Sequence, residues 1–88
     1  MKSKDAYEAL CAAIEADPRK HLVSSDYSNE HFGNFVIAYE ENGAPKSVIN
    51  DRLQLALCDD LDGIENCRIV LHSLQGADEA TTLSTIGL

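Results

Sequence analysis

The chain has 88 residues, a formal net charge of −8 at pH 7 and a hydrophobic fraction of 44%. This length supports a single domain, residues 1–88, and the composition is typical of a globular chain and not of a disordered one. The negative charge argues against nucleic acid or an anionic membrane as the partner, because phosphate binding requires clustered Lys and Arg. No apolar run approaches the roughly 18 residues needed to cross a bilayer. We therefore expect a cytoplasmic protein.

The three cysteines, Cys11, Cys58 and Cys67, do not form an even disulfide framework. We expect free thiols in a reducing compartment, although Cys58 and Cys67 flank one loop and could approach each other if adjacent strands pair there. No C-x-x-C motif or closely spaced Cys/His pair indicates a zinc site.

The first predicted element is an amphipathic helix over residues 4–16, with Ser3 as its N-cap and Pro18 just after its end. Its apolar stripe recurs at helical spacing and consists of Tyr7, Leu10, Cys11 and Ile14. From Pro18 to His31 the periodicity is lost. The SSDYSN sequence is typical of a loop, and Leu22 and Val23 could form a turn or a short strand.

Residues 33–58 predict three short strands joined by two tight turns. Asn42-Gly43 is the strongest hairpin signal, because a type I′ turn needs positive φ at both central positions. A second turn at Asp51-Arg52 would place Asn50 opposite Leu53 and Val48 opposite Leu55.

This register sorts the side chains onto two faces, because they alternate along a strand. One face is apolar: Phe35, Ile37, Tyr39, Val48, Leu53, Leu55 and Leu57. The other face carries Ala38, Glu40, Ser47, Gln54 and Cys58, with Val36 and Ile49 as apolar exceptions. We expect the helix stripe to cover the apolar face.

Residues 67–72 predict a fourth strand, and residues 77–86 predict a weak helix with Ala80, Leu83 and Ile86 at spacing three and Gly87 as its C-cap. The expected fold is α+β: a two-layer sandwich of an antiparallel four-stranded meander, an N-terminal helix packed on one face and a short C-terminal helix.

The charge is unevenly distributed, since residues 40–65 contain seven acidic residues against two basic ones, a balance of −5. In a meander, the hairpin tip after Tyr39 and the loop after Leu57 lie at the same end of the sheet. We therefore predict an acidic patch that binds a basic partner and consists of Glu40, Glu41, Asp59, Asp60, Asp62 and Glu65.

The chain offers little for catalysis or cofactor binding. Residues 60–63 read D-x-D-G, but the corresponding calcium loop would have Cys58 first and Ile69 twelfth, where oxygen ligands are required. No nucleophile motif surrounds a serine or cysteine, and no glycine-rich phosphate loop occurs. We expect no metal, no cofactor and no enzymatic activity.

The sequences FGNFVIAYEENG and SVINDRLQLALCD, within residues 32–60, resemble small immunity proteins of bacterial polymorphic toxin and contact-dependent growth inhibition systems. Several such families carry an FGN strand start and an NDRGQ-like strand joint; here Leu53 stands in the place of the glycine. The resemblance implies a non-enzymatic inhibitor that binds and blocks a cognate toxin domain, often a basic nuclease. Alternatives are a nucleic-acid-mimicking inhibitor, a small secretion chaperone or a dimerising structural or regulatory domain.

Overall fold

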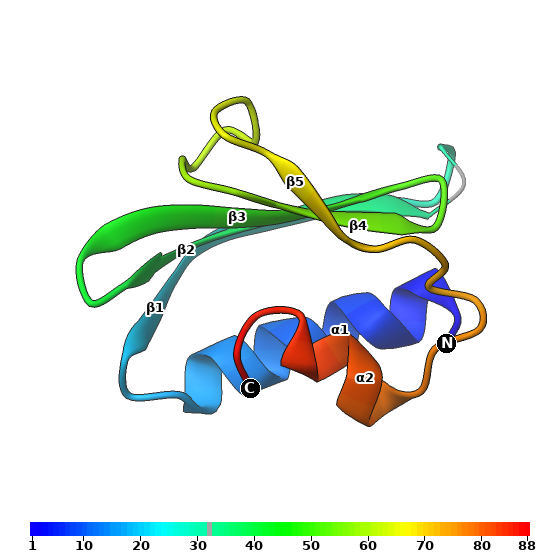
Figure 1. Ribbon diagram of the computed structural model, residues 1–88, viewed down its shortest axis with the longest axis horizontal. Helices are drawn as coiled ribbons and strands as arrows, with labels where there is room; N and C mark the ends of the chain where they lie inside the picture. Colours follow the sequence, from blue (N-terminus) through cyan, green and yellow to red (C-terminus); the bar gives the residue numbers. More distant parts are fainter. Residues whose placement is uncertain (32) are drawn as a thin grey trace.

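The computed structural model describes residues 1–31 and 33–88; Phe32, which begins the FGN sequence, lies outside the described residues. The elements are α1 (Ser3–Ala16), β1 (Lys20–Ser28), β2 (Asn34–Glu41), β3 (Ala44–Asp51), β4 (Gln54–Cys58), β5 (Arg68–Leu71) and α2 (Glu79–Ser84). The strands form an antiparallel sheet in the order β1-β2-β3-β4-β5. Both helices cover one face, here called the inner face (Figure 1). The α+β class and both helices are as predicted.

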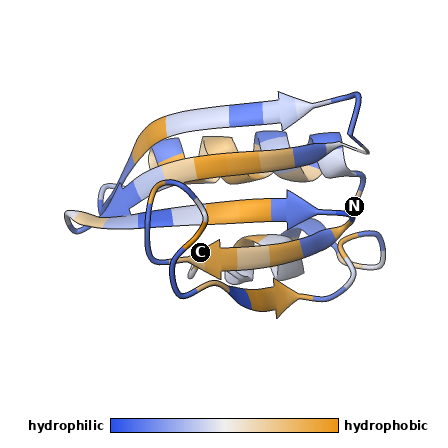
Figure 2. Ribbon diagram, turned by 90° about the horizontal axis from the view of Figure 1, so that it is seen from above, coloured by the Kyte–Doolittle hydropathy of each residue, from blue (hydrophilic) through white to orange (hydrophobic). Residues whose placement is uncertain are grey.

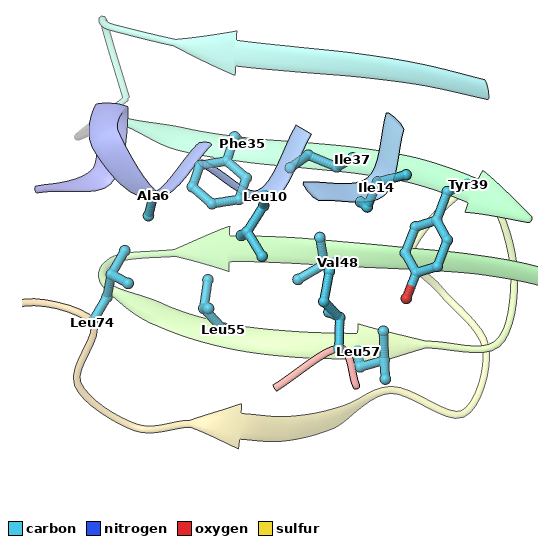
Figure 3. Packing of buried hydrophobic residues seen from close by; sticks show 11 residues of the cluster. Ala6, Leu10, Ile14, Phe35, Ile37, Tyr39, Val48, Leu55, Leu57 and Leu74 are labelled. Carbon is cyan, nitrogen blue, oxygen red and sulfur yellow. The ribbon is translucent and has the colours of Figure 1, made fainter. Parts of the chain in front are cut away.

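The core lies between α1 and the inner face (Figure 3). From α1 it takes the fully buried Leu10 and Ile14. The sheet contributes the predicted apolar face, of which these residues are buried: Phe35, Ile37, Tyr39, Val48, Leu55 and Leu57. Leu53 is half-buried and packs against this cluster. The prediction that the helix stripe covers the apolar sheet face is therefore confirmed.

The hairpin between β2 and β3 also has the predicted register. Asn42 and Gly43 have φ values of 52° and 83°, as a type I′ turn requires. Ile37 pairs with Val48, and Glu41 pairs with Ala44. This turn follows from local chemistry, since Asn and Gly are the residues that adopt positive φ at least cost.

The second turn was predicted one residue too early. Arg52 and Leu53 are its central residues, with φ values of 52° and 69°, so Asn50 pairs with Leu55 and Val48 with Leu57. Two contacts from distant segments fix this position: the Arg52 amide donates to Asn34 Oδ1 at 2.9 Å, and the Leu53 carbonyl accepts from the Leu74 amide at 2.8 Å. The inner face keeps the same residues, because the pairing shifts by an even number.

The sheet has five strands, and the prediction of four missed β1. The SSDYSN segment, predicted as a loop, forms most of this edge strand and pairs with β2. A bulge at Val23 interrupts the alternation between Leu22 and Ser24, which hides the period of two in the sequence. Pairing with β2 therefore makes this segment a strand, although its local chemistry favours a turn.

The helices differ from the predicted ones at their ends. The N-cap of α1 is Lys2, which forms no capping hydrogen bond through its side chain. The predicted cap, Ser3, is already in the helix, and its hydroxyl oxygen lies 3.3 Å from the hydroxyl oxygen of Tyr27. Helix α2 is shorter than the predicted residues 77–86 and has Asp78 as its N-cap. Of the three residues at spacing three, Ile86 is buried, Leu83 is half-buried and Ala80 is exposed.

Cys58 and Cys67 form a disulfide, so the expectation of free thiols is wrong for this pair and holds for Cys11 alone. The bond ties the start of β5, which is shorter than the predicted residues 67–72, to the end of β4. Among the described residues, no helix is long and apolar enough to cross a membrane.

Candidate functional site

The predicted acidic residues lie at one end of the sheet. Glu40 and Glu41 end β2, and the other four belong to the loop of residues 59–66 between β4 and β5, here called the acidic loop. An ion pair of 2.8 Å between Lys46 on β3 and Asp59 joins this loop to the hairpin. The meander thus brings together acids that are some twenty residues apart in the chain, as predicted.

Three of the six predicted residues have their carboxylates engaged within the protein. Glu41 forms an ion pair of 2.8 Å with Lys20. The hydrogen bond from Lys46, together with its charge, lowers the pKa of the Asp59 carboxyl below the ordinary value. The Asp60 carboxylate accepts from the backbone amides of Gly63 and Ile64 at 2.9 and 3.1 Å. These acids shape and anchor the patch and are less available to a partner.

The other three residues, Glu40, Asp62 and Glu65, form no ion pair with any residue that the structure describes. Asp62 and Glu65 are exposed, and Glu40 is half-buried. Side chains alternate along β2, so Glu41 lies on the inner face with Tyr39, whereas Glu40 and its cross-strand partner Pro45 lie on the outer face, which is the sheet face away from both helices. Of the six predicted acids, those available to a partner are thus on the outer face and on the acidic loop.

The acidic loop lies on the outer face of the sheet, over β3 and β4 (Figure 2). Gly63 packs on Ile49 so closely that an added Cβ would lie only 2.3 Å from Ile49 Cδ1, and its φ is +74°, which favours glycine. At the far end of the loop, the disulfide holds Cys67 to β4. The loop is therefore fixed against the sheet at both places.

The outer face was predicted to be mostly polar, yet part of it is buried. The acidic loop that covers it is the reason. Ala38 and Cys58 are 2% and 0% exposed, although both point away from the helices. Ser47 is also fully buried, and its hydroxyl has no hydrogen-bond partner in residues 1–31 and 33–88.

An apolar row crosses the same face beside the acids. The strand pairings align Val36, Ile49, Ala56 and Ile69 on neighbouring strands. Ile69 is 49% exposed, and Ile64, next to Gly63 on the acidic loop, is 77% exposed. Leu61 adds a third exposed apolar side chain. No apolar residue of this site was predicted from the sequence. The sequence did contain one indication of it, because Val36 and Ile49 were apolar exceptions on the predicted polar face.

Behind the hairpin tip, a buried ion cluster holds the start of β1 in place. The Lys20 side chain is fully buried, and its ammonium lies 2.9 Å from Asp17 and 2.8 Å from Glu41. Burial alone would lower the pKa of Lys20, but the hydrogen bonds with Glu41 and Asp17 outweigh it and raise the pKa above its ordinary value. Arg19 forms two hydrogen bonds from its guanidinium to Asp17, which also accepts from the Arg19 backbone amide.

The described side chains of His, Cys, Asp and Glu nowhere form a group of three that could hold a metal ion. The arrangement instead offers a surface: exposed isoleucines with carboxylates around them, on a loop fixed by a disulfide. Such a surface can bind a protein that presents apolar side chains among basic ones. No protein-family model, curated protein or solved structure matches this chain.

Proposed function

We propose that the protein is a non-enzymatic immunity protein that binds a cognate toxin domain through the outer face, with a basic nuclease domain as the partner. One observation carries this proposal: the acidic loop presents Ile64 and Leu61 together with Asp62 and Glu65 on one fixed segment. The sequence resemblance of residues 32–60 to small immunity proteins supports it from a different direction.

The two kinds of side chain have different tasks in such a complex. Carboxylates speed the approach of a basic partner through long-range attraction, which salt screens, while affinity depends on a desolvated apolar centre. Ile64, which is 77% exposed, supplies that centre, together with Ile69, the exposed end of the apolar row on the sheet.

The rival classes fit this surface less well. A nucleic-acid mimic needs its acids spread over a surface as an array of free charges, whereas Glu41, Asp59 and Asp60 are used internally. A secretion chaperone or a dimerising domain requires self-association, which equilibrium sedimentation of the purified chain tests directly.

The proposal includes a cytoplasmic location, and the Cys58–Cys67 disulfide is the feature that opposes it. Thiols of cytosolic proteins are kept reduced, whereas disulfides persist in oxidising compartments. Alkylating thiols in rapidly quenched cells measures the state of the pair. Labelling of both cysteines supports the cytoplasm, and their protection assigns the protein to an oxidising compartment.

The decisive experiment is rescue: co-expression with the toxin domain of the neighbouring open reading frame should restore growth. Association should then be measured with Glu40, Asp62 and Glu65 reversed to Lys, since these acids have no ion pair within residues 1–31 and 33–88. We expect the association rate to fall about tenfold or more at low salt and to lose most of its salt dependence.

A matched control has the same change in charge on the opposite face. Asp5, Glu8 and Glu15 are exposed on α1, and their reversal to Lys should leave most of the salt dependence in place. In a third variant, Ile64→Ala, the dissociation rate should rise while the association rate changes little. Equal effects of the two triple reversals would show that only net charge matters and would refute the proposed binding face.

A further inference from the structure

A second surface feature lies on the inner side of the sheet, at the same end as the hairpin tip. A recess of about 260 Å³ is lined by Arg19, Tyr39, Glu41, Lys46, Leu57, Arg68 and residues 85–87. Three of the seven Lys and Arg residues of this acidic chain therefore surround one small recess. These three cations contrast with the net charge of −8 of the whole chain.

The three cations are not equally available. Arg19 pairs with Asp17 at 2.9 Å and Lys46 pairs with Asp59 at 2.8 Å. Arg68 forms no ion pair with any residue that the structure describes. Its partner across the sheet is Leu57, so its side chain belongs to the inner side of β5, facing the recess.

Tyr39 supplies the second polar group. The residue is 1% exposed and lines the recess, and its ring lies on the inner face with the hydroxyl directed towards the side of Leu57 (Figure 3). Burial raises the pKa of Tyr39 to about 12, with Glu41 adding to the rise and Arg68 opposing it, which places the phenol in the field of both charges. The hydroxyl therefore stays protonated at neutral pH and can donate a hydrogen bond.

We propose that this recess binds a small organic carboxylate, with its oxygens on the Arg68 guanidinium and the Tyr39 hydroxyl and its apolar part on Leu57 and Ile86. The planar guanidinium matches a carboxylate in geometry and can donate two parallel hydrogen bonds. Leu57 and Ile86 are 7% and 4% exposed and provide an apolar floor.

Two features narrow the ligand class. Glu41, whose carboxylate is already bonded to Lys20, lines the recess and disfavours a dianion such as phosphate. The volume is below the range of about 300–1,000 Å³ that accommodates drug-sized ligands, so the acid has a short tail. This inference does not depend on the proposed toxin partner, because the recess opens on the inner side.

The test is a titration of the full chain with sodium butyrate, monitored by amide proton–nitrogen correlation NMR spectra. We expect saturable shifts at Tyr39, Arg68 and residues 85–87 in the millimolar range. Sodium chloride, sodium phosphate and butylammonium chloride at equal ionic strength should not produce them. A blocked glutamate that binds more tightly than butyrate would support the carboxylate site and assign its ligand to a protein side chain.

Variants separate the two donors from general charge effects. Arg68→Gln should weaken butyrate binding about tenfold or more, and Tyr39→Phe should weaken it less, because a neutral donor contributes less than a charged one. Arg52→Gln is the matched control, since Arg52 is exposed at the turn between β3 and β4, at the opposite end of the sheet. The proposal is overturned if butyrate gives no saturable shifts up to tens of millimolar, or if Arg68→Gln binds it as the wild type does.

Discussion

At the scale of single residues, the least expected feature is a lysine inside an acidic protein. The Lys20 side chain is fully buried, yet its ammonium contacts two carboxylates, Asp17 and Glu41. Removing a charge from water is costly unless it is paired and hydrogen-bonded, and this pair of acids satisfies both conditions. Asp17 lies just beyond α1 and Glu41 ends β2, so one ammonium links the helix, the edge strand and the hairpin.

Asp17 makes this cluster sensitive to acid. The hydrogen bonds from Arg19 and Lys20 hold the pKa of its carboxyl well below the ordinary value of 3.8. An acid whose pKa is lower in the folded state stabilises the fold above its unfolded pKa, and this stability is lost as the pH falls through the folded pKa. The free energy of unfolding should therefore decrease below about pH 4 in the wild type.

The comparison variant is Asp17→Asn, measured by urea unfolding at several pH values. It should be less stable than the wild type at neutral pH, and the difference should shrink as the pH falls below 4. Asp5→Asn removes the same charge from an exposed position on α1 and should not reproduce this convergence. Parallel curves for Asp17→Asn and wild type down to the lowest pH would contradict the assigned role.

At the scale of elements, the sheet depends on its contact with α1. Leu55 on β4 is fully buried in the cluster that includes Leu10 and Ile14. Replacing Leu55 with Ala should lower the free energy of unfolding by about 2–5 kcal/mol, because it removes buried methyl groups and leaves a cavity. Denaturant titration measures this loss. Val23→Ala on β1 is the control, since Val23 is 46% exposed and should change stability by no more than about 0.5 kcal/mol.

The acidic loop is a second element whose order depends on one bond. Without the Cys58–Cys67 disulfide, the segment between the cysteines would have greater freedom in the unfolded chain, and its hold on the outer face would weaken. The variant with both cysteines replaced by Ala should lose about 2–3 kcal/mol of stability and become susceptible to proteolysis within residues 59–66.

Reductant provides an independent check on the same bond. It should lower the melting temperature of the wild type but not that of the double variant. A wild-type melting temperature that reductant leaves unchanged would mean that the disulfide contributes no stability.

At the scale of the whole molecule, the charge of −8 favours solubility and opposes compaction, because like charges repel one another. Added salt should therefore raise the melting temperature at neutral pH, since it screens exposed charges more strongly than the buried Lys20 cluster. Neutralising Glu40, Asp62 and Glu65 with Gln, Asn and Gln removes three acids without an ion pair among the described residues. This variant should melt at a higher temperature and respond less to salt, measured by circular dichroism.

The matched comparison neutralises Asp5, Glu8 and Glu15, which are spread along exposed positions of α1. If repulsion is concentrated around the acidic loop, this second variant should retain more of the salt response of the wild type. An equal response of both variants would indicate that the repulsion is spread over the whole surface.

The sequence by itself determined the features that depend on neighbours in the chain. Asn42-Gly43 specified a turn, because only a few residues adopt positive φ cheaply, and this turn together with alternation gave the apolar face from Phe35 to Leu57. The helical spacing of Leu10 and Ile14 likewise predicted the helix that covers it. The crowding of acids at one end followed from the meander alone.

The tertiary structure decided what depends on partners far along the chain. Strand β1 exists because β2 offers it a backbone to pair with, although its own residues favour a loop. The second turn sits at Arg52-Leu53 because Asn34 and Leu74 hold it there. The tertiary structure also determines which acids are available to a partner. Glu41 forms an ion pair with Lys20 and Asp59 forms one with Lys46, and no local sequence pattern predicts these pairs.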